Sequence, residues 1–96
     1  LLAEDNELNR EIAAFLLKDE GISVTEAEDG QQAVECFLKM PEGYYDAVLM
    51  DIMMPVMDGY QAARAIRGSG KKDAEMIPII AITANAFVED KRKRTI

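Results

Sequence analysis

The sequence predicts an α/β fold in which helices cover both faces of an open, mostly parallel sheet. Short apolar runs of three to five residues alternate with longer stretches whose apolar residues recur every three or four positions, as in strands that alternate with helices. Residues 47–50 and 79–82 contain no polar side chain, which is typical of parallel strands buried on both faces. With right-handed crossovers, the order β-α-β-α-β-α-β-α predicts a doubly wound sheet.

The chain opens with a short strand and an amphipathic helix. Leu1-Leu2-Ala3 is the first strand. Either Asp5 or Asn6 is expected to cap the helix that follows, and Gly21 ends that helix. One helical face carries the apolar residues Leu8, Ile12, Phe15 and Leu16, and this face is expected to pack inward.

The second strand and helix follow the same plan. Ile22 and Val24 alternate with polar residues in the segment 22–25, which predicts an edge strand that is buried on one face. Asp29 with Gln32 three positions later resembles a capping box. The helix after this cap presents the apolar stripe Ala33, Val34, Phe37 and Leu38.

The third and fourth strands end in polar residues. Residues 47–50 form a buried strand that Asp51 terminates, and Asp58 is the expected cap of a third helix that turns Ala62, Ala63 and Ile66 inward. Residues 79–82 form the fourth strand, which ends at Thr83, and residues 85–94 are predicted to be a fourth helix.

Length and composition limit the classes of function. The 96 residues suffice for one domain, residues 1–96, and the net charge of −7 argues against nucleic-acid binding. No apolar run approaches the roughly 20 residues of a spanning helix, so we expect no membrane contact and a cytoplasmic location. Histidine is absent, so the chemistry must depend on carboxylates and hydroxyls.

Three of the predicted strands end in residues that carry oxygen. Glu4 and Asp5 follow the first strand, Asp51 the third and Thr83 the fourth. The carboxyl ends of parallel strands line one crevice, so these side chains are expected to converge. Three carboxylates in one crevice repel each other, and a hard divalent cation that keeps several waters, Mg²⁺, resolves this repulsion.

Asp51 is the best-placed nucleophile of this group. An aspartate beside Mg²⁺ can attack a phosphoryl group in line and form an acyl phosphate. Glu4 and Asp5, adjacent in sequence, are better suited to holding the ion. Thr83 offers a hydroxyl that can bind a phosphoryl oxygen.

Three segments, residues 2–6, 50–59 and 82–86, resemble response-regulator receiver domains of two-component systems. The resemblance implies a flavodoxin-like fold with strand order 2-1-3-4-5. It also implies that Asp51 is the phosphoacceptor, that Glu4 and Asp5 are the acidic pair at the Mg²⁺ site, that Met53 gives its backbone carbonyl to the ion, and that Thr83 is the switch hydroxyl.

The resemblance also implies partners. Residues 4–11 and 83–90 are most similar to receivers attached to hybrid sensor histidine kinases. The expected partner is therefore a histidine kinase or a histidine phosphotransfer protein, whose phosphoryl group passes to Asp51. The domain itself would accept this group rather than turn over a substrate, and a homodimer is left open.

One feature departs from the family pattern. Receiver domains carry a lysine at the end of a fifth strand, but Lys71, Lys72, Lys91 and Lys93 follow no fifth apolar run. The fifth strand and helix are not in the sequence, so we expect it to be incomplete at its C-terminal end. A receiver without this lysine could act as a docking module that is not phosphorylated. A phosphatase of the haloacid-dehalogenase kind is a further alternative, although it requires a second aspartate where this chain has Met53.

Overall fold

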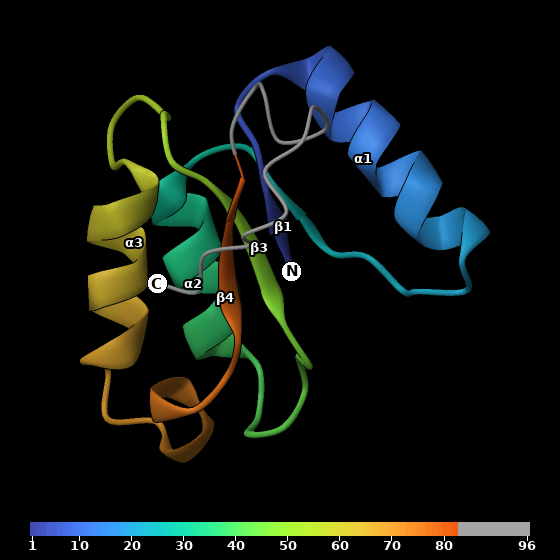
Figure 1. The fold of residues 1–96 in the computed structure, drawn as a ribbon. Coiled ribbons are helices and arrows are strands. Elements are labelled where there is room, and N and C mark those ends of the chain that lie inside the picture. The colour runs from blue at the N-terminus through green and yellow to red at the C-terminus, as the bar shows by residue number, and fades with distance from the viewer. Residues whose placement is uncertain (83–96) are drawn as a thin grey trace.

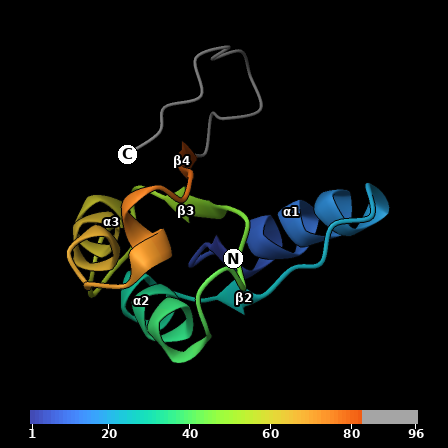
Figure 2. The ribbon, with the colours of Figure 1, turned by 90° about the horizontal axis from the view of Figure 1, so that it is seen from below.

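Helices lie on both faces of a four-stranded parallel sheet in the computed structural model, which describes residues 1–82 (Figure 1). Seen along the strands, α1 lies on one face, and α2 and α3 lie on the other (Figure 2). The elements are β1 (Leu2–Ala3), α1 (Glu7–Asp19), β2 (Glu26–Ala27), α2 (Gly30–Lys39), β3 (Val48–Asp51), α3 (Gly59–Arg67), the 3-10 turn η1 (Lys72–Glu75) and β4 (Ile79–Ile82). This arrangement confirms the predicted fold class. Thr83 and the helix expected over residues 85–94 lie outside the described residues.

The strand order is β2-β1-β3-β4, and every neighbouring pair is parallel. This is the order predicted for the first four strands. The chain moves from β1 to one side to form β2 and then to the other side to form β3, so the topological switch point lies between β1 and β3. Crevices at such points, outside the carboxyl ends of the strands, are where open α/β sheets bind ligands.

The core fills the space between the sheet and the helices α2 and α3. Its largest fully buried side chains come from the strands and from these two helices, and they are Phe37, Met50, Ile66, Ile79 and Val48. Leu2 is also fully buried but is not part of this cluster. Ala33 on α2 and Ala62 on α3 are also fully buried. Because alanine is small, the two helices can lie close to each other and to the sheet.

Side-chain caps set the starts of the three α-helices within residues 1–82. Asn6 accepts a hydrogen bond from the N–H of Asn9 at 2.9 Å, Asp29 from Gln32 at 2.8 Å and Asp58 from Gln61 at 2.9 Å. The caps predicted at Asp29 and Asp58 are therefore confirmed. The open choice at α1 is resolved in favour of Asn6, which leaves the carboxylate of Asp5 available for another role.

The position predicted for the second strand is wrong, although its place at the sheet edge is right. Residues 22–25 are not in a strand, and β2 consists of Glu26 and Ala27. These two residues pair with Leu2 and Ala3 of β1. A strand needs a partner for its backbone hydrogen bonds, and the short β1 reaches only these two residues, together with a bond from the N–H of Leu2 to the carbonyl of Thr25.

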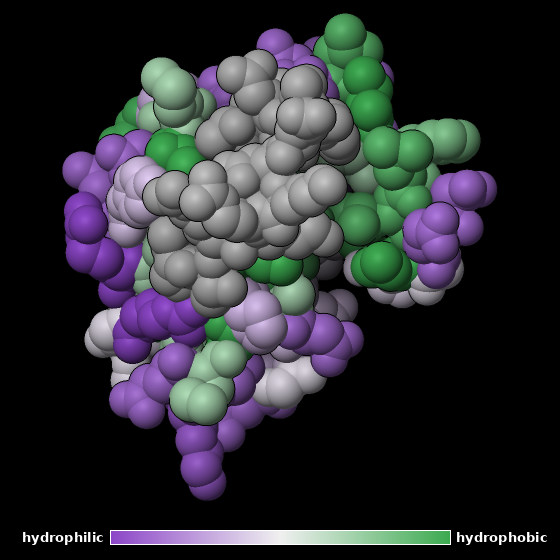
Figure 3. All heavy atoms as spheres, in the orientation of Figure 1, coloured by the Kyte–Doolittle hydropathy of each residue, from purple (hydrophilic) through white to green (hydrophobic). Residues whose placement is uncertain are grey.

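The inward packing predicted for the apolar face of α1 is also wrong. Ala14 is the buried residue of this helix, whereas Leu8, Ile12, Phe15 and Leu16 are between 46% and 66% exposed. Apolar surface accordingly gathers over α1 in Figure 3. Leu38 of α2, predicted to face inward, is exposed as well. Helical spacing identifies a face, but it does not reveal how much of that face a neighbouring element covers.

We expect Gly59→Ala to destabilise the fold. A Cβ atom at this position would overlap the carbonyl oxygen of Asp51 and would lie 2.9 Å from the Cα of Ile52, so the backbone after β3 would have to shift. Overpacking of this kind costs about 1–3 kcal/mol. Urea unfolding measures the loss.

Gly68→Ala is the matched control, because a Cβ there meets only the carbonyl oxygen of Arg64, at 3.3 Å. An equal loss of stability in both variants would show that the close approach at Gly59 does not matter.

Candidate functional site

Two carboxylates meet at the switch point of the sheet. Ala3 of β1 pairs with Met50 of β3, so the next residue along each strand, Glu4 and Asp51, sits at the same carboxyl edge. Asp5 follows Glu4 in the turn to α1. One carboxylate oxygen from each of the three residues lies within 4.8 Å of the other two. The convergence predicted for Glu4, Asp5 and Asp51 is therefore present.

The backbone holds the two inner carboxylates in place. Glu4 and Asp51 are each only 7% exposed, whereas Asp5 is open to solvent. The N–H of Asn6 donates to Oε2 of Glu4, and the N–H of Met53 donates to Oδ1 of Asp51, both at 3.1 Å. The buried acids thus each accept a bond from a backbone N–H two residues further along the chain.

Burial makes the ionised forms of these acids unfavourable. Desolvation, followed by the neighbouring carboxyl of Asp51, raises the pKa of Glu4 to about 7. Desolvation also raises the pKa of Asp51. Without a cation, the pocket therefore binds a proton more tightly than free carboxylates do.

The donor set fits a hard divalent cation. Every side chain in the group offers oxygen, and two of the three carboxylates are buried against each other, where positive charge would relieve their repulsion. Mg²⁺ binds through one or two carboxylates and retains several waters. This suits a pocket with two buried acids and a third, Asp5, that is open to solvent.

Met53 adjoins the pocket through its main chain. Its N–H donates to Asp51, and its side chain is exposed, so any part it plays at the site comes from its backbone. Thr83, which the sequence predicts to belong to the same site, lies outside the described residues.

The loop after Asp51 is tightly constrained. The N–H of Gly59 donates to the carbonyl of Ile52 at 2.9 Å, and the N–H of Met57 donates to the carbonyl of Pro55 at 2.7 Å. A Cβ on Gly30, the first residue of α2, would overlap the carbonyl oxygen of Met57. The starts of α2 and α3 therefore confine this loop on two sides. Between them, Val56 adopts a left-handed backbone with a φ of 69°.

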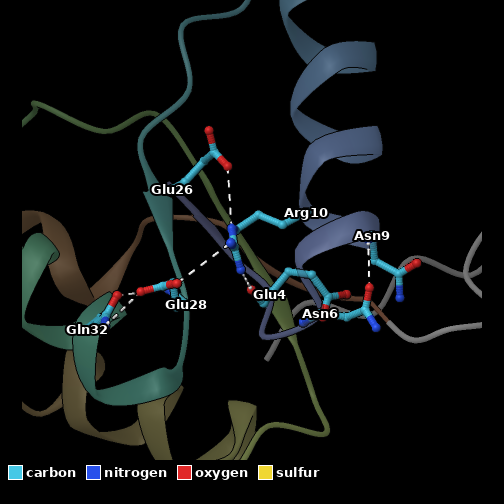
Figure 4. Close-up of polar contacts among 7 residues, drawn as sticks. All are labelled: Glu4, Asn6, Asn9, Arg10, Glu26, Glu28 and Gln32. Carbon is cyan, nitrogen blue, oxygen red and sulfur yellow. Dashed lines mark hydrogen bonds and ion pairs between the residues drawn. The ribbon is translucent and has the colours of Figure 1, made fainter.

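Sequence reasoning missed Arg10. Its guanidinium donates from Nη1 to the backbone carbonyl of Glu4 at 2.9 Å (Figure 4), and its side chain is only 12% exposed. Arg10 lies four positions after the cap Asn6, on the first turns of α1. The sequence does not indicate that this arginine is buried, because charged residues on amphipathic helices usually lie in solvent.

Comparison with known proteins gives the family. The family model of the response regulator receiver domain matches residues 1–95, so the chain belongs to this family. Over 95 residues it is 42% identical to hybrid signal transduction histidine kinase I of Dictyostelium discoideum, with 97% of this chain and 6% of that protein covered. The chain therefore spans only a small fraction of that relative.

Solved structures agree on the fold. The receiver domain of sensor histidine kinase PA1611 of Pseudomonas aeruginosa PAO1 has a TM-score of 0.77 and 41% identity, with 96% of this chain and 71% of that chain covered; it holds a magnesium ion in its active site cleft. The response regulator TrrA of Thermotoga maritima, in complex with Mg²⁺ and beryllofluoride, has a TM-score of 0.75 and 30% identity, with coverage of 94% and 72%. The chain is thus a receiver domain of two-component signalling with an acidic pocket at the expected edge of the sheet.

None of the helices within residues 1–82 has the length and apolar character needed to cross a bilayer.

We expect the metal-free protein to lose stability as the pH rises from about 4.5 to about 7. The pKa of Glu4 is about 7 in the folded chain against an ordinary value of 4.5. The unfolded chain therefore releases this proton first, and unfolding becomes more favourable across that window, by about 2 kcal/mol. Urea unfolding in a chelator at pH 5 and pH 7.5 measures the change.

Glu4→Gln isolates this effect, because the amide keeps the shape of the side chain and does not titrate. The unfolding free energy of the variant should change less with pH over the same window, and the variant should be more stable than the parent at pH 7.5. An unchanged pH dependence would contradict the prediction.

We expect Val56→Asn to stabilise the chain by about 1 kcal/mol, because a left-handed backbone costs a branched L-residue about 1–2 kcal/mol and asparagine tolerates it better. Val56 is 78% exposed, so little packing is lost. Thermal unfolding measures the gain. Val56→Ala removes the branched side chain, but alanine tolerates a left-handed backbone less well than asparagine, so its gain in stability should be smaller. A larger gain with alanine would contradict the explanation.

Proposed function

We propose that Asp51 accepts a phosphoryl group from a phosphohistidine of a partner protein in a Mg²⁺-dependent step. The observation that supports this most strongly is the meeting of Asp51 with Glu4 and Asp5 at the switch point of the sheet, with one oxygen from each within 4.8 Å. Membership of the receiver family and the magnesium ion in the cleft of the PA1611 receiver support it further.

The proposal gives each residue of the pocket a role. Glu4, Asp5 and Asp51 would hold Mg²⁺, together with the backbone carbonyl of Met53. The ion would neutralise charge on the transferring phosphoryl oxygens. Its positive charge would also favour the ionised form of Asp51, which burial alone disfavours.

Transfer requires one free oxygen on Asp51. The N–H of Met53 binds Oδ1, so we assign the attack to Oδ2. As the bond from Oδ2 to phosphorus forms, the bond from phosphorus to the imidazole nitrogen breaks. That nitrogen keeps the electron pair and takes a proton from solvent. Asp51 then carries an acyl phosphate.

The expected partner is a histidine kinase or a histidine phosphotransfer protein, as the similarity to hybrid histidine kinases suggests. In this proposal the hydroxyl of Thr83 binds a phosphoryl oxygen, the domain thereby switches its conformation, and it works in the cytoplasm. The net charge of −7 disfavours nucleic acid as a partner.

Two other functions remain as outcomes of the test. A docking module would use the same fold without phosphorylation. A phosphatase of the haloacid-dehalogenase kind would need a second aspartate where this chain has Met53, so it is disfavoured.

Beryllofluoride, which mimics a bound phosphoryl group, tests the proposal. With Mg²⁺, we expect it to shift the amide resonances of Asp51 and its neighbours in the parent chain and to leave Asp51→Asn unchanged, because that variant lacks the acceptor oxygen. Asp46→Asn is the matched control, since Asp46 is an exposed acid just before β3, at the opposite end of the strand.

No shift in the parent chain would favour docking alone. Turnover of a phosphomonoester that is lost in Asp51→Asn would favour the phosphatase.

A further inference from the structure

Arg10 connects three parts of the chain beside the acidic pocket (Figure 4). Nη1 donates to the carbonyl of Glu4 at 2.9 Å. Nε lies 3.5 Å from Oε1 of Glu26 on β2, and Nη2 lies 3.7 Å from Oε1 of Glu28, just after β2. The guanidinium therefore ties the turn between β1 and α1 to the end of the neighbouring strand.

The connection continues into α2. The N–H of Glu28 donates to Oε1 of Gln32 at 3.0 Å, and Gln32 also bonds the cap Asp29. Of the two glutamates that contact Arg10, Glu28 is thus itself bonded to α2. Its planar, five-donor head can serve a carbonyl and two carboxylates together, which the single ammonium group of lysine does less well.

The atom that Arg10 binds is part of the pocket itself. The carbonyl of Glu4 belongs to the peptide that joins Glu4 to Asp5, and a peptide unit is planar and rigid. A hydrogen bond to this oxygen therefore restricts the orientation of both residues at once. The bond leaves their carboxylate oxygens available for the pocket.

We propose that Arg10 is a positioning residue for the cation site: it fixes the peptide between Glu4 and Asp5 so that both carboxylates face Asp51. The inference rests on the proposed Mg²⁺ site. Partners that orient metal ligands without touching the metal typically contribute about 10–100-fold to metal affinity.

Charge and position predict opposite effects of removing this residue. Arg10 is a cation close to the proposed cation site, so its charge alone repels Mg²⁺, and Arg10→Gln would tighten Mg²⁺ binding if charge were its whole contribution. If Arg10 acts by position, Arg10→Gln weakens binding even though a repelling charge is gone. The sign of the change separates the two explanations.

The test is Mg²⁺ titration of the folded chain, followed by calorimetry and by amide shifts, well below the unfolding temperature. We expect Arg10→Gln to weaken Mg²⁺ binding at least tenfold. Arg10→Lys, which keeps the charge but loses the fork, should also weaken it. In the metal-free state, the amides of Asp5 and Asn6 should shift and exchange faster in both variants.

Arg64→Gln is the matched control. It removes the same charge from an exposed position in the last turn of α3, away from the carboxyl edge of the sheet, and should leave Mg²⁺ affinity within about twofold of the parent, as expected of a distant, screened charge.

Unchanged or tighter Mg²⁺ binding in Arg10→Gln would overturn the inference. So would failure of both Arg10 variants to fold, which would make Arg10 a stabilising residue of the whole domain. If the parent chain itself does not bind Mg²⁺, the proposed cation site fails first, and this outcome is distinct from the other two.

Discussion

The burial of two acids side by side is the constraint on which the rest of the site depends. Glu4 and Asp51 end neighbouring parallel strands and are each only 7% exposed. Burial disfavours negative charge on both acids and raises both pKa values, and the carboxyl of Asp51 raises the pKa of Glu4 further. A cation should bind such a pocket favourably, because it offsets the free-energy cost of burying ionised carboxylates.

The surrounding contacts hold the acids largely by their backbones. The N–H of Glu4 donates to the carbonyl of Ala27 at 3.1 Å, and its own carbonyl accepts from Arg10. Each of the two acids accepts one further bond at a carboxylate oxygen, from Asn6 or Met53. The pocket is therefore positioned before any ligand arrives, while the remaining carboxylate oxygens can still take part in chemistry. Preorganisation of this type lowers the entropic cost of binding a ligand.

The parts of this site that the sequence predicts are those with local causes. Polar residues directly after apolar runs identify Glu4, Asp5 and Asp51, because the carboxyl ends of parallel strands share one edge. Asp29 and Asp58 were predicted as caps because a cap bonds only three residues away. The sequence does not distinguish Asp5 from Asn6 as the cap of α1, since both residue types can cap a helix.

The parts that the sequence does not predict depend on distant partners. The alternation of Ile22 and Val24 favoured a strand, but the pairing of β1 placed β2 at Glu26 and Ala27 instead. The apolar spacing of α1 predicts an inward face, but Leu8 and Phe15 are exposed. The contacts of Arg10 cannot be predicted locally, because its three acceptors lie at Glu4, Glu26 and Glu28, at sequence separations from 6 to 18 residues.

The same contacts explain how a side chain that offers no ligand atom to the pocket can still matter for it. The turn that carries Glu4 and Asp5 follows a strand of only two residues, so ladder hydrogen bonds alone constrain it weakly. Asn6 fixes the far end of this turn by capping α1. Arg10, on α1, bonds the carbonyl of Glu4 in the middle of the turn. Its guanidinium also contacts Glu26 of β2, the strand beside β1 in the sheet. A rigid pocket at the end of a short strand therefore requires a contact of this kind, and Arg10 provides it.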